Sequence, residues 1–169
     1  PPEIRDFFID TGLSKDELLK YIGTGAPVTR ERTLIEMGDC VNSKSLDNRV
    51  SVFILLECLK SMDQEVLPMD FYAVFTVQEE MGLRGATVAA SSIQPDFGIA
   101  LDTTIAYDLP GAQAHEMVTK LGLGPAVKIM DSLVISDYRM VNYMKSVAKT
   151  QNIPYQLEIL QGGGTDTAA

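Results

Sequence analysis

Two stretches of this sequence are apolar on nearly every side, so each must be covered by other parts of the fold. Between positions 48 and 62 the apolar residues lie nearly all round a predicted helix, which indicates a helix buried deep in a core. Residues 71–77 are apolar on both faces, as is typical of an inner strand in a parallel sheet covered by helices on both sides. Together these stretches predict a layered α/β fold.

Strand and helix patterns alternate through most of the chain. After the two apolar stretches, residue spacing predicts a helix over 82–93, strands over 97–101 and 127–130, a helix from about 133 to 150 and a strand over 155–160. Strands that alternate with helices favour a mostly parallel sheet with helices on both faces.

The beginning of the chain has a different character. Ser14 followed by Glu17 is a capping-box pattern, and it predicts a short helix. Residues 32–37 alternate loosely before a Gly-Asp pair, which predicts a strand and a turn. We therefore expect two parts, a small β-rich segment up to about Asn42 and an α/β part from Asp47 onwards.

The charge balance limits the partners of the chain. Its 169 residues include 14 Lys and Arg against 23 Asp and Glu, a net charge of −9, so its field repels nucleic acid and anionic membranes and attracts cations. No apolar run approaches the roughly 18 residues of a membrane span. Cys40 and Cys58 lack the spacing of a zinc ribbon or a disulfide framework. We therefore expect a cytoplasmic protein that binds neither nucleic acid nor membrane.

Acidic residues follow the predicted strands. Glu79 and Glu80 come after one strand, Asp102 after the next, and Asp166 after the glycine loop that follows the last, while Asp47 starts the apolar helix. In open parallel sheets, ligands bind beyond the carboxyl ends of the strands. Two carboxylates about 4 Å apart repel by roughly 4 kcal/mol at an effective dielectric constant near 20, so such a cluster must be spread out, protonated or neutralised. A divalent cation is the simplest solution.

The adjacent pair Glu79 and Glu80 suggests a division of roles. Successive side chains on an extended segment point in opposite directions, so both cannot face one metal ion from the same side. One carboxylate is then expected to bind metal while the other accepts a proton from metal-bound water. That arrangement is typical of metal-assisted hydrolysis.

Five strings in this order resemble the M42 family of metallo-aminopeptidases, the glutamyl aminopeptidase or tetrahedral peptidase group. They are KSLDNR (44–49), FTVQEEMGLRGA (75–86), IALD (99–102), LGLGPA (121–126) and GGGTD (162–166). Some members of the family carry an endoglucanase label. The resemblance implies a zinc-peptidase-like catalytic domain over 44–169, preceded by the tail of a small β-rich dimerisation domain over 1–43.

The resemblance also implies a site and an assembly. It gives two divalent ions, zinc or cobalt, with Asp47 bridging them, Glu80 on one ion, Asp102 on the other and Glu79 as general base. The substrates would be peptides that lose their N-terminal residues. The complete protein would be a homo-oligomer in which dimers assemble into a larger hollow particle.

The sequence departs from the family pattern in its histidines. The family places one histidine ligand on each metal ion, whereas the single histidine here, His115, lies before LGLGPA, matches neither position and is expected in a surface loop. We therefore expect the chain to be the central portion of an aminopeptidase. Carboxylates without imidazole are hard oxygen donors that suit Mg, Mn or Ca better than Zn, so zinc binding and turnover by this portion alone stay open.

Two alternatives remain at this point. A glycoside hydrolase would need two carboxylates about 5 to 9.5 Å apart across a sugar bond, which suits chain neighbours such as Glu79 and Glu80 poorly. A noncatalytic metal-binding or assembly module is the other alternative, because the histidines are missing. The roles of Asp166, as substrate contact or helix cap, and of Arg84, as substrate contact or exposed helix-end residue, are also open.

Overall fold

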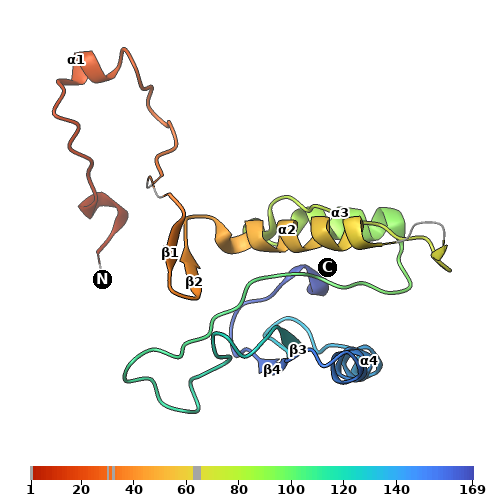
Figure 1. Cartoon of the computed structure of the whole chain (residues 1–169). Coiled ribbons are helices and arrows are strands. Elements are labelled where there is room, and N and C mark those ends of the chain that lie inside the picture. The colour runs from red at the N-terminus through yellow and green to blue at the C-terminus, as the bar shows by residue number, and fades with distance from the viewer. Residues whose placement is uncertain (1, 30, 32, 63–65) are drawn as a thin grey trace. The chain divides into compact units, whose positions relative to one another are not determined.

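The chain divides into two compact units, Pro1–Lys44 and Ser45–Ala169. The computed structural model describes residues 2–29, 31, 33–62 and 66–169, and Figure 1 marks their helices and strands. The assignment of residues 1–43 to a dimerisation domain stays a prediction.

The first unit contains short elements that local sequence signals specify. After the 3-10 turn η1 (Ile4–Asp6), helix α1 (Lys15–Leu18) confirms the predicted short helix. The Ser14 hydroxyl accepts from the Glu17 amide at 3.4 Å, and the Glu17 carboxylate accepts from the Ser14 amide at 3.1 Å. The capping box thus satisfies donors at both positions.

An antiparallel hairpin follows in the same unit. Strands β1 (Ile35–Met37) and β2 (Cys40–Asn42) pair across a two-residue turn at Gly38 and Asp39. This confirms the predicted strand and turn, although Arg32 at the start of the predicted strand lies outside the described residues. Gly38 has φ +60°, a left-handed conformation that glycine adopts easily.

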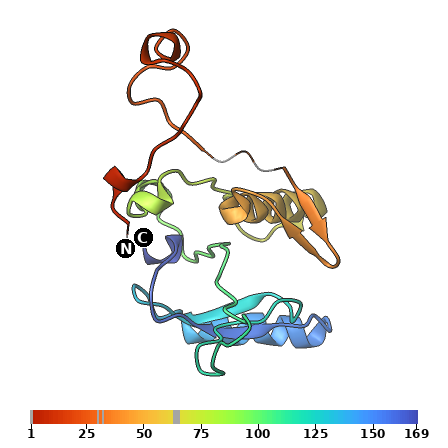
Figure 2. The ribbon, with the colours of Figure 1, turned by 90° about the vertical axis from the view of Figure 1, so that its left-hand side faces the viewer.

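The second unit is a mixed α/β arrangement. Its elements are α2 (Leu46–Ser61), η3 (Glu79–Met81), α3 (Arg84–Ile93), β3 (Ala126–Met130), α4 (Tyr138–Thr150), β4 (Gln156–Ile159) and η4 (Asp166–Ala168). Strands β3 and β4 are parallel, with Lys128 opposite Glu158. Figure 2 shows α4 beside this pair, and α4 contacts β3. A helix between two parallel strands is the βαβ arrangement.

Helix α4 begins later than the apolar spacing predicts. Residues ahead of it form a turn, in which the Asp131 carboxylate accepts from the amides of Leu133 at 2.8 Å and Val134 at 3.0 Å. Regular helix starts only at Tyr138. Val141 and Ala148, seven positions apart, are its buried residues, and this spacing places them on one face.

The expected burial of α2 is wrong, although the helix itself is confirmed. Ser51 is the buried residue of α2, and Phe53 is 61% exposed. A helix with apolar residues on every side needs neighbours on every side, and the described elements leave most of this helix exposed.

The strands predicted over 71–77 and 97–101 are also wrong. Both segments lack a ladder partner among the described residues, and a strand requires hydrogen bonds to a neighbouring strand. Of the predicted mostly parallel sheet with helices on both faces, the described part of the chain contains only the parallel β3–β4 pair. Within the described part of the chain, none of the helices is long and apolar enough to cross a membrane.

A glycine fixes the approach of the loop before β3 to the start of β4. Gly124 has φ +91°, and a Cβ there would overlap the Pro154 carbonyl. The Gln156 side-chain amide donates to the Gly124 carbonyl at 2.8 Å. The backbones can approach this closely only because no side chain stands between them.

We expect Gly124→Ala to be more destabilising than Gly122→Ala. Gly122 also has a positive φ, +79°, but open space around it, so alanine there costs only the left-handed strain of about 1–2 kcal/mol. Alanine at position 124 adds a clash of roughly 1–3 kcal/mol. Urea unfolding of both variants measures the difference, and equal midpoints would contradict the close approach.

The cap of α4 predicts a pH dependence. Asp137 accepts from the Arg139 and Met140 amides at 2.8 and 3.3 Å, and its hydrogen bonds with Arg139 lower its pKa from 3.8 to about 2. The contribution of Asp137 to stability is therefore complete above pH 3.8 and is lost as the pH falls towards 2. Asp137→Asn keeps an acceptor but removes the charge. Thermal midpoints of the two proteins should differ at pH 5 and converge near pH 2; a constant difference would count against this cap.

Candidate active site

The predicted site residues come from separate segments of the second unit. Asp47 lies in the first turn of α2, where its backbone is not helical. Glu79 and Glu80 lie in η3, Asp102 in an irregular segment, and Asp166 begins η4. The carboxylates thus sit at element ends and loops, where side chains are free to face a ligand.

Asn48 joins the start of α2 to Asp102. Its side-chain amide donates to Asp102 Oδ1 at 2.7 Å and to the Leu101 carbonyl at 3.2 Å. The same Oδ1 accepts from the Thr103 amide at 2.8 Å. The LDNR and IALD strings are therefore held together by direct hydrogen bonds, with Asp47 next to the residue that makes the link.

Thr76 makes a second link, between the segment before η3 and the last glycine loop. Its hydroxyl donates to Asp166 Oδ2 at 2.6 Å. Asp166 Oδ1 is buried and has no hydrogen-bond partner among the described residues. An unpaired carboxylate oxygen away from water is costly, so this atom is available to a further ligand.

The charges of the other carboxylates act on Glu79 and Asp102. Burial raises the pKa of Glu79, and the charges of Asp102, Glu80, Asp166 and Asp47 raise it further. Burial likewise raises the pKa of Asp102, helped by Asp47 and Asp166, whereas the Thr103 amide and the Lys128 ammonium lower it. Like charges close enough to perturb one another favour a bound cation.

The local geometry of Glu79 and Glu80 corrects the sequence argument. They lie in the 3-10 turn η3 and not in an extended segment. Successive residues of a 3-10 helix are about 120° apart, so the side chains still diverge. Glu79 is half-buried and Glu80 is exposed, which keeps different roles possible for the two.

The oxygen donors of these carboxylates suit a divalent cation, but their positions do not form a complete metal site. Over the described residues, no group of three or more His, Cys, Asp or Glu side chains is placed to hold a metal ion. The donor set is oxygen only, as hard divalent ions prefer, and one buried carboxylate oxygen of Asp166 lacks a partner. Metal binding by Asp47, Glu80 and Asp102, and general-base action by Glu79, remain predictions.

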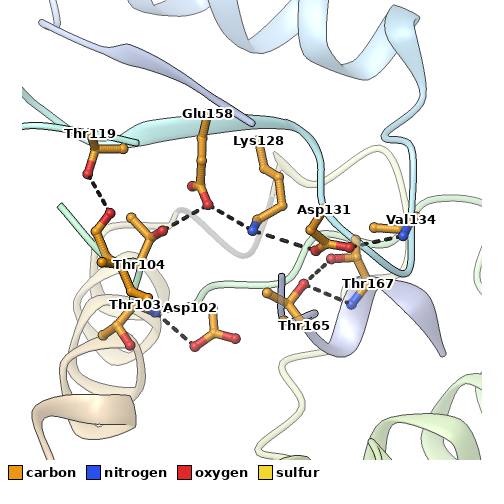
Figure 3. Close-up of polar contacts among 12 residues, drawn as sticks. Asp102, Thr103, Thr104, Thr119, Lys128, Asp131, Val134, Glu158, Thr165 and Thr167 are labelled. Carbon is orange, nitrogen blue, oxygen red and sulfur yellow. Dashed lines mark hydrogen bonds and ion pairs between the residues drawn. The ribbon is translucent and has the colours of Figure 1, made fainter. Parts of the chain in front are cut away.

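Sequence reasoning missed a buried ionic network beside Asp102 (Figure 3). Lys128 Nζ lies 2.8 Å from Glu158 Oε1 and 3.5 Å from Asp131 Oδ2. The Thr104 hydroxyl donates to the same Glu158 oxygen at 2.8 Å. The available signal was a charged residue inside each of two apolar strand runs, AVKIM and QLEI, since charges are rarely buried unless paired.

Two residues whose roles were open lie on the surface. His115 is exposed in the loop ahead of β3, as expected for a surface histidine. Arg84 is the first residue of α3 and is also exposed. Neither has a described contact with the carboxylates.

Comparisons with known proteins agree on one family. A family model described as M42 glutamyl aminopeptidase matches residues 1–169. An Acetivibrio thermocellus protein provisionally named an aminopeptidase is 41% identical over 165 residues, which cover 97% of this chain and 49% of that protein. The chain thus spans about half the length of this relative.

Two solved structures are also similar to this chain. An aminopeptidase from the archaeon Desulfurococcus kamchatkensis matches with a TM-score of 0.89 and 40% identity, over 99% of this chain and 48% of that one. A structure titled PhTET1-12s, described as a dodecamer, matches with a TM-score of 0.73 and 27% identity, over 92% of this chain and 46% of that one.

The raised pKa values predict how the cation-free chain responds to pH. Glu79 and Asp102 bind protons more tightly in the folded than in the unfolded state. The stability they contribute is therefore full below their ordinary pKa values and falls as the pH rises through the raised values. In the presence of a chelator, we expect the thermal midpoint to fall as the pH rises above the ordinary pKa values of these two groups, and Asp102→Asn to reduce this slope.

A matched control is Asp96→Asn. Asp96 is an exposed loop carboxylate that is not among the groups acting on Glu79 or Asp102. The slope should be unchanged in this variant. If Asp102→Asn had the same slope as the wild type, burial and the neighbouring carboxylates would not raise the pKa of Asp102 as described.

Proposed function

The chain belongs to the M42 family of glutamyl aminopeptidases, and we propose that it forms part of a metal-dependent aminopeptidase that removes N-terminal residues from peptides. The observation that carries this proposal is the pair of hydrogen-bonded links that hold the acidic segments, from Asn48 to Asp102 and from Thr76 to Asp166, together with the raised pKa of Glu79, to which burial and then the charges of the other carboxylates contribute. These residues come from segments far apart in the chain. Membership of a peptidase family supports a catalytic role for these carboxylates, which would account for their being brought together despite their repulsion.

In this proposal Asp47, Glu80 and Asp102 would hold two divalent ions, and Asp47 would serve as a ligand to both. Such ions lower the pKa of a coordinated water towards 7. Oxygen donors alone favour hard cations, so a zinc or cobalt centre requires histidine ligands beyond the carboxylates present here. Asn48 supports the set, because its amide orients Asp102 through Oδ1.

Glu79 is proposed as the general base. Burial and its carboxylate neighbours raise its pKa, which moves the group towards the working range of a base near neutral pH. Glu79 is half-buried and the neighbouring Glu80 is exposed. In this proposal Glu79 accepts a proton at a carboxylate oxygen and is not a metal ligand. Glu79 would then donate that proton to the amine that leaves the peptide, so that the same residue would act first as a base and then as an acid.

Assembly is the further part of the proposal. The PhTET1-12s structure is described as a dodecamer, and this supports a homo-oligomer for the complete protein, whereas its assembly from dimers stays a prediction. A cytoplasmic location stays a prediction from cysteine content. The glycoside hydrolase alternative gains no support, since the matched family and the named relatives are aminopeptidases.

We expect Glu79→Gln to retain metal but to lose about 10²–10⁴-fold in kcat, the usual contribution of a general base. The assay uses protein from the complete coding sequence and an aminoacyl chromogenic substrate, and a chelator should abolish the wild-type activity. Glu57→Gln is the matched control, because Glu57 is an exposed residue of α2 paired with Lys60.

Three outcomes would count against the proposal. Unchanged turnover in Glu79→Gln removes this residue from the reaction. Hydrolysis of a glucan without peptide hydrolysis favours the glycosidase alternative. Metal binding without any hydrolysis favours a noncatalytic module.

A further inference from the structure

Beside the carboxylate cluster, the β3–β4 pair carries charge on one buried face. Lys128 and Glu158 are directly opposite in the parallel register. Glu158 is 2% exposed, the Lys128 side chain 17% and the Asp131 side chain 0%. Moving such charges out of water is expensive even when they are paired, and apolar residues often serve stability equally well. Their presence here therefore calls for a role beyond stability.

The contacts of Glu158 point towards Asp102. Glu158 Oε1 accepts from Lys128 Nζ and from the Thr104 hydroxyl, each at 2.8 Å. Thr104 is two residues beyond Asp102, and the Thr103 amide between them donates to Asp102 Oδ1. Figure 3 shows Lys128, Glu158 and Thr104 in line beside Asp102.

The segment that carries Asp102 needs such an anchor. It belongs to no strand ladder among the described residues. Besides Thr104, its tethers include Thr119, whose hydroxyl donates to the Ile105 carbonyl at 3.3 Å and whose amide donates to the Ala106 carbonyl at 3.4 Å. The hydroxyl of Thr104 thus links the segment of Asp102 to β4, in addition to the link from Asn48 to Asp102 itself.

We propose that Lys128, Glu158 and Thr104 form a positioning unit that holds Asp102 in place for a divalent cation. This inference rests on the proposed function, because it takes Asp102 as a metal ligand. Glu158 fixes the Thr104 hydroxyl, Lys128 fixes Glu158 and neutralises its charge, and Asp131 holds Lys128 from the other side at 3.5 Å. None of the three residues of the unit touches the reacting atoms.

The test is cobalt binding by the protein from its complete coding sequence. Thr104→Val removes only the hydroxyl link, and Thr104→Ser restores it. We expect Thr104→Val to weaken Co²⁺ binding about 10–100-fold, as is typical when a group that orients a ligand is lost, and Thr104→Ser to bind like the wild type. Competition with a chromophoric chelator measures the affinity, and the visible absorption of bound Co²⁺ reports its coordination.

Lys128→Met tests the charged part of the unit, with Lys149→Met as its control. Lys149 is an exposed lysine in the last turn of α4. Because Lys128→Met leaves two buried carboxylates unpaired, the double variant Lys128→Met with Glu158→Gln provides a second form that should fold. Both should lose Co²⁺ affinity, whereas Lys149→Met should not.

The outcomes separate this inference from the proposed function. If wild-type protein binds no Co²⁺ and hydrolyses no peptide, the proposed function fails, and this inference fails with it. If the wild type binds Co²⁺ and Thr104→Val has the same affinity and spectrum, only the positioning unit is overturned. A lower thermal midpoint with unchanged Co²⁺ binding likewise makes the network merely structural and overturns it.

Discussion

Repulsion among carboxylates is the constraint on which the second unit depends. Glu79 and Asp102 have raised pKa values because burial and neighbouring acids oppose their ionisation. A fold that relied on stability alone would separate such charges or bury apolar residues in their place. In the proposed function, a bound cation would make the same arrangement favourable.

Three polar links hold the cluster where regular secondary structure does not. Asn48 connects α2 to Asp102, Thr76 connects the η3 segment to Asp166, and the Lys128 network connects β3 and β4 to Thr104. Each joins segments that are distant in sequence. In irregular backbone, such side-chain contacts set the geometry that a ligand requires, so they carry as much of the proposed function as the carboxylates themselves.

The sequence predicts local structure better than it predicts burial. The capping box of α1, the apolar spacing of α4 and the strand patterns of β3 and β4 depend on nearby residues, and all four elements form. The strand predicted over 71–77 requires a partner from elsewhere in the chain, and the described residues provide none. The acidic residues could be selected by position and resemblance. Asn48 could not be assigned as the partner of Asp102, because the two residues are 54 positions apart.

Anomalous diffraction from crystals of the cobalt-loaded complete protein would locate bound ions without reference to activity. We expect two cobalt peaks within coordination distance of Asp47, Glu80 and Asp102, with Asp47 between them and Glu79 beside them but not coordinated. Peaks elsewhere, or Asp47, Glu80 and Asp102 facing different regions of the protein, would rule out the proposed metal site.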